Sequence, residues 1–265
     1  MAEKLPVTIK KGNSIKEAAI TLFLSNPIIK PERFKELVNI PELGGFFQQH
    51  QAIGAFTLKL GNIPKDQKSE TNFKNDTGFK LLKFENGAPT FVVQGINELD
   101  RTFFSFHDLN YSRWINLKNN FDNILKNIKT IQSDIFVNGL SVHYIDEFLW
   151  DSSQEFDLSR IMKAEDYLPN NFIKIKGGHL SNTRECETKD GQKLFDRLEV
   201  LVNSSIEKVI TISHNQTVLT SNLFEYGSVE FDKNIGALLE ELHENNKELL
   251  RNVLLKEVNE LIKLN

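Results

Sequence analysis

The stretch 102-TFFSFHDLNYSRWINLKNNFDNILKNIKTIQSDIFVNGLSVHYIDEFLW-150 carries the clearest structural pattern in the chain. Its first part, Thr102–Leu109, has the composition of a strand. In Tyr111–Lys129 the apolar residues fall three and four apart on one face, which predicts a long amphipathic helix. Ile135–Trp150 then predicts a second, longer strand. The stretch therefore predicts a strand, a helix and a strand in direct succession.

The residues before this stretch predict a short helix among several strands. Asn86-Gly87 is a strong hairpin signal, because both residues tolerate a positive φ, so the strands beside it are expected to be antiparallel. The predicted elements are strands at Glu17–Ile28, Phe46–Leu60, Gly78–Glu85 and Pro89–Asn97, a helix at Pro31–Asn39 and a loop at Gly61–Thr77.

The residues after the stretch repeat this order of elements. We predict a short helix at Asp157–Asp166, strands at Phe172–Leu180, Phe195–Asn203, Val209–Thr220 and Ser228–Phe231, turns at Asp190-Gly191 and Asn215, and a helix at Lys233–Leu264 with Asp232 as its N-cap. The fold class expected is α+β, with two similar halves, each a curved antiparallel sheet with a short and a long helix on one face. The halves are residues 1–133 and 134–265. An internal duplication would explain their shared order, and the alternative is that a common arrangement of meander and helix arose twice by chance.

The composition is that of a globular protein without special cross-links. The chain has 265 residues, 40% of them hydrophobic and 26% charged, and a formal net charge of -4. That charge argues against a duplex nucleic-acid binder, which usually carries a basic excess, although nucleic acid stays open as a partner. The single cysteine, Cys186, excludes an intrachain disulfide. No apolar run is long enough to span a bilayer, so a cytoplasmic protein without a membrane partner is expected.

Common catalytic motifs are missing from the sequence. There is no Gly-rich phosphate loop, no Gly-x-Ser-x-Gly elbow and no His-Glu-x-x-His pair, so no cofactor and no metal site are predicted and the balance leans away from an enzyme. The remaining catalytic candidates are His143 with Asp146 and His107 with Asp108. A histidine could act as a general base with a partner from another strand. The competing interpretations are a polar sheet surface for the first pair, whose side chains would point to opposite faces of a strand, and a helix cap for Asp108.

The C-terminal helix is predicted to be longer than the sheet of one half. Its apolar residues beyond that sheet would then need a partner, either another protein or a second copy of the chain. Alternatively, the helix crosses both halves and is buried within one chain. The candidate partner-binding residues are Leu249, Leu250, Val253, Leu254, Val258 and Leu261.

Three short motifs in the chain resemble those of one bacterial family. Tyr111 and Trp114 match a Tyr-x-x-Trp helix start, the strand Val142–Asp146 is similar to Leu-Arg-Tyr-Ile-Asn, and Leu242-His243 matches a Leu-His pair in the last helix. The family is sporadically distributed and of unknown function. The resemblance implies the same order of elements and a patchy gene distribution of the kind shared by defence and toxin–antitoxin loci. Here His143 stands in place of Arg and Asp146 in place of Asn. The replacement of Arg by His removes a permanent charge.

Three functions are compatible with these observations. The first is a protein-binding or regulatory subunit of a bacterial defence or toxin–antitoxin-type system, with no catalysis of its own. The second is a metal-assisted hydrolase acting on nucleic acid, which requires His143 and His107 to converge with acidic residues. The third is a small-molecule-binding module with a cavity between sheet and helix.

Overall fold

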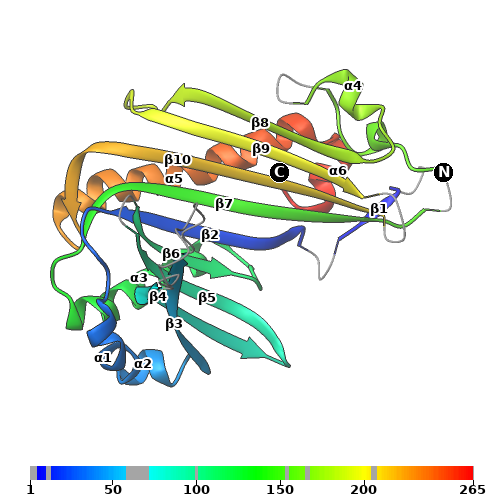
Figure 1. Cartoon of the computed structure of the whole chain (residues 1–265). Coiled ribbons are helices and arrows are strands. Elements are labelled where there is room, and N and C mark those ends of the chain that lie inside the picture. Colours follow the sequence, from blue (N-terminus) through cyan, green and yellow to red (C-terminus); the bar gives the residue numbers. More distant parts are fainter. Residues whose placement is uncertain are drawn as a thin grey trace, which may run out of the picture.

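The computed structural model of the chain describes residues 5–9, 13–57, 72–98, 101–152, 155–164, 168–203 and 208–264. These residues form one antiparallel sheet with helices packed on one of its faces (Figure 1). The strands are β1 (Val7–Thr8), β2 (Ile15–Leu24), β3 (Gln49–Thr57), β4 (Asn72–Glu85), β5 (Ala88–Asn97), β6 (Thr102–Asp108), β7 (Phe136–Trp150), β8 (Gly178–Glu187), β9 (Lys193–Asn203) and β10 (Val209–Glu225).

The strand order places the pairing of β2 with β7, which joins the two halves, in the middle of the sheet. It is β3-β4-β5-β6-β2-β7-β10-β9-β8, with the short β1 also paired to β7. On each side of the central β2–β7 pair, the last strand of the half lies next to the first, and the earlier strands follow outward. The α+β class is thus confirmed, and both halves contribute to a single sheet.

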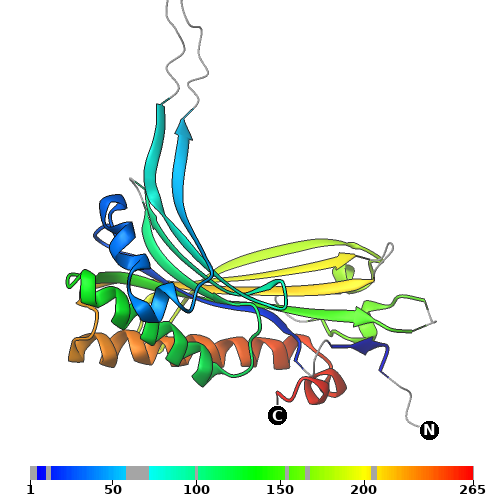
Figure 2. The same cartoon turned by 90° about the horizontal axis from the view of Figure 1, so that it is seen from below.

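The helices cover one face of this sheet, which we call the covered face (Figure 2). On it lie alternate residues of the strands, such as Ile20, Phe104, Tyr144, Leu198 and Ile212, all of which are buried. The helical elements are η2 (Pro31–Arg33), α1 (Phe34–Val38), α2 (Pro41–Gly44), α3 (Trp114–Ile131), η3 (Leu158–Arg160), α4 (Asn170–Ile173), α5 (Val229–Val253) and α6 (Lys256–Leu261).

The buried apolar residues form two clusters that do not follow the expected boundary between residues 133 and 134. The larger cluster includes Leu22, Phe121 and Leu140, and also Leu242 of the last long helix. The second cluster joins the far ends of β7, β9 and β10 to α4, to the end of α5 and to α6. Helix α5 therefore packs in both clusters. None of the described helices is long and apolar enough to cross a membrane.

The pattern of the opening stretch is confirmed closely. Strand β6, helix α3 and strand β7 fall within a few residues of their predicted bounds. The hairpin at Asn86-Gly87 is also confirmed, with φ of 53° and 79°, the left-handed values that a type I′ turn requires. Helix α3 starts later than expected, at Trp114, and its N-cap Arg113 makes no side-chain capping bond.

Several other predicted elements are wrong. Residues 172–173 and 229–231 belong to helices and not to the strands predicted there, and Asn215 lies inside β10 and not at a turn. Residues 72–77 of the predicted loop lie in β4, while residues 58–71 are outside the described part of the chain. Of the predicted helix at 157–166, only Leu158–Arg160 is helical, and residues 165–167 are not described.

The predicted C-terminal helix is two helices. It begins at Val229 with Ser228, and not Asp232, as its N-cap, and the helical hydrogen bonds end at Val253. The backbone at this point pairs instead with the segment after η3: the Leu255 amide donates to the Ile161 carbonyl at 2.9 Å, and the Lys163 amide donates to Val253 at 2.9 Å. Since no Pro or Gly interrupts the sequence here, this tertiary pairing is what divides the helix.

Candidate functional site

The face of the sheet opposite the helices is the open face, and it carries the main candidate site. In Figure 2 the helices lie on the other side of the sheet, and the hairpin of β3 and β4 projects away from them. Alternation along each strand assigns residues to this face. We define it by the following described residues: Glu17, Ala19, Thr21, Phe23, Gln94, Ile96, Phe103, Ser105, His107, Gly139, Ser141, His143, Ile145, Glu147, Phe195, Arg197, Glu199, Leu201, Ser213, Asn215, Thr217 and Leu219.

A row of apolar side chains crosses one end of the open face. The strand register sets Leu219 beside Gly139, Gly139 beside Phe23, Phe23 beside Phe103, and Phe103 beside Ile96. A Cβ at Gly139 would stand 2.9 Å from Leu219 Cδ2, so the glycine lets the leucine side chain lie across it. Leu219 is nevertheless 53% exposed.

The next row across the same strands consists of hydroxyl-bearing residues. Thr217 pairs with Ser141, Ser141 with Thr21, and Thr21 with Ser105. Asn215 Oδ1 accepts hydrogen bonds from Thr217 at 3.1 Å and from Ser141 at 3.3 Å. This row therefore satisfies part of its own hydrogen-bonding capacity and presents the rest on the open face.

Two of the candidate histidines lie on the open face, on either side of one small residue. His107 and His143 both pair with Ala19, which is buried between their strands. His107 Nδ1 lies 2.7 Å from Glu17 Oε1, and its Nε2 lies 3.1 Å from Ser105 Oγ. The hydrogen bond from His107 lowers the pKa of the Glu17 carboxyl, although burial opposes this. Such a pair holds an ionised carboxylate against a histidine.

His143 has a different partner. Its Nε2 lies 2.8 Å from Ser213 Oγ on the neighbouring strand β10. Burial lowers the pKa of the imidazole, and the nearby Glu17 carboxylate opposes that shift. A neutral His143 can accept a hydrogen bond from the serine or donate one to it.

The two candidate aspartates point away from these histidines. Asp108 and Asp146 lie on the covered face and are buried. Asp146 Oδ1 accepts a hydrogen bond from Ser14 Oγ at 2.5 Å, and Asp108 Oδ1 accepts one from the backbone amide of Asn110 at 2.9 Å, which stabilises the turn before α3. Burial raises the pKa of each carboxyl to about 6. The sheet thus separates each candidate aspartate from its candidate histidine.

Metal ligation has little support in this arrangement. No group of three or more His, Cys, Asp or Glu residues within the described ranges is placed to hold a metal ion. The polar segment around the β8–β9 turn forms local ion pairs instead, such as Lys193 with Glu185 at 2.6 Å. The nearby Cys186 thiol has its pKa raised, chiefly by burial and further by Asp196.

The residues of the three short motifs meet in one cluster on the covered face. Tyr144 OH lies 2.7 Å from His243 Nδ1, and the Trp114 ring stacks on the His243 ring at 4.4 Å between centroids. Tyr111 packs edge-on against Tyr144 at 6.1 Å. Trp114 Nε1 donates to the Glu240 carboxylate at 2.8 Å. Burial lowers the pKa of His243 to about 4, so within this cluster His243 is the neutral hydrogen-bond partner of Tyr144.

The apolar residues expected to overhang at the C-terminus are covered within the chain. Leu249, Leu250, Val253, Leu254 and Val258 are all buried, and the partly buried Leu261 packs against the same cluster. Their neighbours there include Trp150, Phe156 and Met162. Of the two possibilities predicted for this helix, the structure therefore has the one in which the helix is buried within its own chain, because α5 crosses from one cluster to the other.

One buried polar cluster on the covered face has no counterpart in the sequence predictions. His214 Nε2 lies 2.6 Å from Asp196 Oδ1, and its Nδ1 lies 2.8 Å from Asn246 Oδ1. Gln216 Nε2 donates to the same Asp196 oxygen at 3.2 Å. The only sequence signal was polar residues at inward positions of β9 and β10, which strand alternation alone does not distinguish from a slipped register.

Comparison with known proteins finds no relative of this chain. No protein-family model matches the chain, and none of the curated proteins or solved structures is significantly similar to it.

Proposed function

We propose that the chain is a protein-binding or regulatory subunit that performs no catalysis of its own and that contacts its partner through the open face. The observation that carries this proposal is the row of Leu219, Phe23, Phe103 and Ile96, apolar side chains on a face over which no described helix lies. An exposed apolar strip bordered by polar residues is typical of a protein interaction site.

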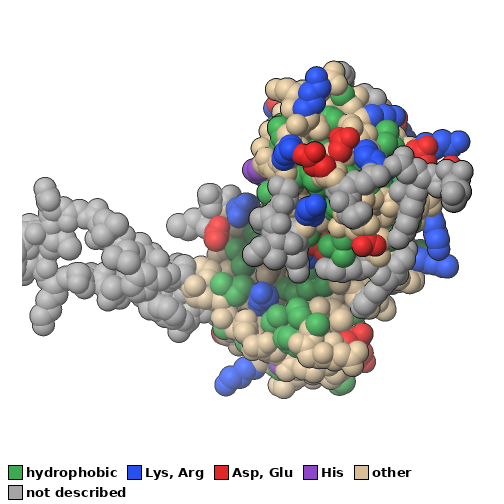
Figure 3. Space-filling view, turned by 90° about the vertical axis from the view of Figure 1, so that its right-hand side faces the viewer, with side chains coloured by type: hydrophobic (Ala, Val, Ile, Leu, Met, Phe, Trp, Pro, Cys, Tyr) green, Lys and Arg blue, Asp and Glu red, His purple; other side chains and the backbone are tan. Residues whose placement is uncertain are grey.

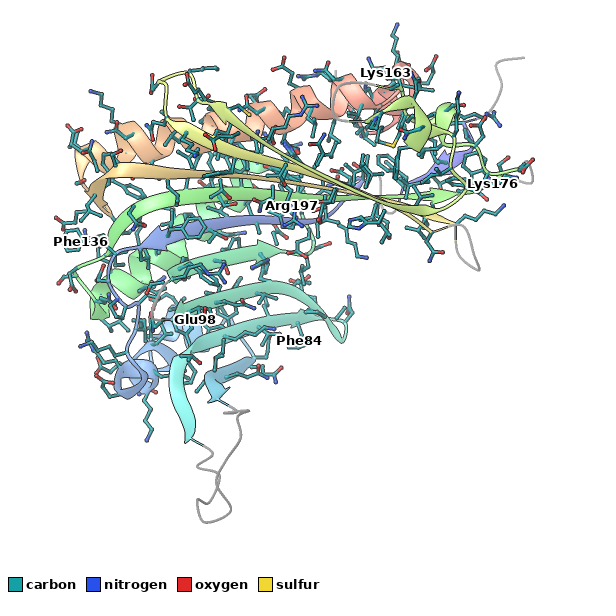
Figure 4. The ribbon with its side chains drawn as sticks, turned by 45° about the horizontal axis from the view of Figure 1, so that its top comes forward. Phe84, Glu98, Phe136, Lys163, Lys176 and Arg197 are labelled. Atoms are coloured by element: carbon teal, nitrogen blue, oxygen red, sulfur yellow. The ribbon has the colours of Figure 1, made fainter. Side chains whose placement is uncertain are left out.

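The charges on the rest of the open face, away from this strip, favour a protein over a polyanion. Arg197 pairs with Glu199 on β9, and Lys16 pairs with Glu147 at 2.8 Å, so groups of both signs occur together there. Figure 4 places Arg197 over the strands of the sheet, and Figure 3 shows charges of both signs intermingled at the end of the molecule opposite the strip. An apolar strip next to a polar surface of mixed charge is compatible with a protein interface, whereas a nucleic-acid site needs a basic excess.

The arrangement of the histidines gives less support to the hydrolase alternative. That function needed His107 and His143 to converge with the aspartates next to them, and Asp108 and Asp146 are buried on the opposite face. The Glu17–His107 pair is the remaining acid–base arrangement on the open face. A third group, Ser105 Oγ, lies 3.1 Å from His107 Nε2 and completes a carboxylate–histidine–hydroxyl line. Because Ser105 is only 2% exposed, its hydroxyl is poorly placed to attack a substrate, so a binding role accounts for the three residues better than a catalytic one.

The test compares two equally exposed apolar residues on opposite sides of the sheet. Leu219 on the open face and Ile115 on α3 are each 53% exposed. A photo-crosslinking amino acid at position 219 is expected to capture a defined protein, which is then purified and its affinity measured by calorimetry. We expect Leu219→Glu to weaken binding at least about tenfold, roughly 1.4 kcal/mol, because a charge must be desolvated within the apolar strip when the partner covers it.

Ile115→Glu is the control, and it should leave the affinity unchanged. Equal crosslinking from positions 115 and 219, or an unchanged affinity of Leu219→Glu, would refute the open face as the binding surface. Capture of a second copy of the chain would identify the partner as the protein itself, and native mass spectrometry of the two variants would then report the change.

The setting and the origin of the protein are proposed on separate grounds. A role in a bacterial defence or toxin–antitoxin-type system rests on the motif resemblance alone. An internal duplication is supported by the equivalent strand order on either side of β2–β7. It predicts that β2, β6, β5 and α3 superpose on β7, β10, β9 and α5 with inward and outward residues in phase, and a superposition out of phase would count against it.

A further inference from the structure

A polar groove on the covered face lies between the outer strands of the second half and helix α5. It has a volume of ≈ 350 Å³ and is lined by residues of β8, β9, β10 and α5, among them Asp196, Gln216 and Leu249. The β8–β9 turn closes on the helix beside it, where the Lys189 amide donates to Glu241 Oε1 at 2.8 Å. The groove is therefore held between fixed elements and is unrelated to the open face.

One buried atom in the groove lacks a hydrogen-bond partner. Gln216 is 3% exposed, and its amide nitrogen is directed at Asp196 Oδ1. Because the NH2 group of Gln216 donates to Asp196 Oδ1, the carbonyl oxygen Oε1 of the same amide points away from that carboxyl group. That oxygen is buried without a partner among the described groups. An unsatisfied buried acceptor costs about 1–3 kcal/mol, which a bound donor would recover.

The other groups in the groove indicate which donor fits. Three carboxylates line it, those of Asp196, Glu187 and Glu248, against the single guanidinium of Arg184. A negative excess next to an unsatisfied acceptor favours a cation that donates several hydrogen bonds, and an ammonium group donates three. The apolar walls, including Leu194 and Leu249, suit a short methylene chain.

We propose that this groove binds a small alkylammonium ligand, with Gln216 Oε1 accepting a hydrogen bond from the ammonium group. Asp196, whose Oδ1 contacts both His214 Nε2 at 2.6 Å and Gln216 Nε2 at 3.2 Å, supplies a negative charge beside Gln216. Glu187 and Glu248 attract the cation at the rim.

Butane-1,4-diamine is the probe, and its affinity for the full chain is measured by calorimetry and by changes in amide NMR shifts. Butane-1,4-diol is the matched compound, with the same carbon chain and no ammonium group. We expect saturable binding of the diamine, with shifts centred on β9, β10 and α5, and no binding of the diol. Gln216→Leu should weaken the binding of the diamine at least about tenfold.

Gln192→Leu is the control variant, because Gln192 also has a buried carbonyl oxygen without a partner but lies outside the groove lining. It should bind the diamine as the unchanged protein does. If Gln216→Leu fails to fold, the double variant Glu187→Gln with Glu248→Gln at the rim is expected to weaken binding several-fold. Absence of saturable binding, equal binding of the diol, or unchanged affinity of the Gln216 or rim variants would overturn the proposal.

Discussion

The two faces of this sheet place the same kinds of residue in different environments. On the covered face, polar groups are few and deeply buried, and burial raises the pKa of the Asp146 carboxyl to about 6. On the open face, Glu17 is half-buried beside His107, and the hydrogen bond from that histidine lowers its pKa. One strand, β7, supplies both environments through His143 and Tyr144. The covered face thus stabilises the fold, while the open face keeps polar and apolar groups available for contact.

The largest difference between the faces is expected for two leucines of strand β9. Leu198 is fully buried on the covered face, whereas Leu201 is 49% exposed on the open face. Leu198→Ala should lower the free energy of unfolding by about 2–5 kcal/mol, because it leaves a cavity in a packed core. Leu201→Ala should change it by no more than about 0.5 kcal/mol. Urea unfolding of both variants measures this, and equal losses would contradict the division into two faces.

A second difference should appear in the pH dependence of stability. The pKa of Asp146 is about 6 in the folded protein against an ordinary value of 3.8, so between these values the folded state holds a proton that the unfolded chain has released. The contribution of this group to stability therefore falls as the pH rises from about 4 to 6. Asp146→Asn has no such proton to lose.

Relative to the unchanged protein, Asp146→Asn should gain up to about 3 kcal/mol between pH 4 and pH 7, since one unit of pKa corresponds to about 1.4 kcal/mol. The comparison must be made as a difference, because His243, with its pKa lowered to about 4, has the opposite slope. The free energy of unfolding of each protein is measured as a function of pH. A constant difference between the two proteins from pH 4 to pH 7 would contradict the raised pKa.

The smallest difference concerns two hydroxyls that each contact a histidine. Tyr144 OH lies 2.7 Å from His243 on the covered face, and Ser213 Oγ lies 2.8 Å from His143 on the open face. Tyr144→Phe should lower the free energy of unfolding by about 1–3 kcal/mol, because a buried imidazole nitrogen loses its partner. Ser213→Ala should lower it by less than about 1 kcal/mol, since water can replace the hydroxyl. A larger loss for Ser213→Ala, seen in thermal or urea unfolding, would reverse the assignment.

The sequence could predict the elements of the fold better than the site. His143 and Asp146 were expected on opposite faces of a strand, and this is confirmed by their partners Ser213 and Ser14. The partners themselves could not be predicted, because Ser14 is 132 residues away from Asp146 along the chain. The contact between Trp114 and Glu240 could not be predicted for the same reason, because these residues are 126 positions apart in the sequence.

The local sequence by itself determined the elements whose conformation depends only on residues close together in the chain. The helix α3 follows from apolar residues at helical spacing, and the turn at Asn86-Gly87 follows from the φ values that these residues tolerate. Only the tertiary structure decided where the last helix divides. There the backbone near Leu254 pairs with Met162, and no local signal marks the break. It also decided that the two histidines flank Ala19, because strand register is set by packing across the whole sheet.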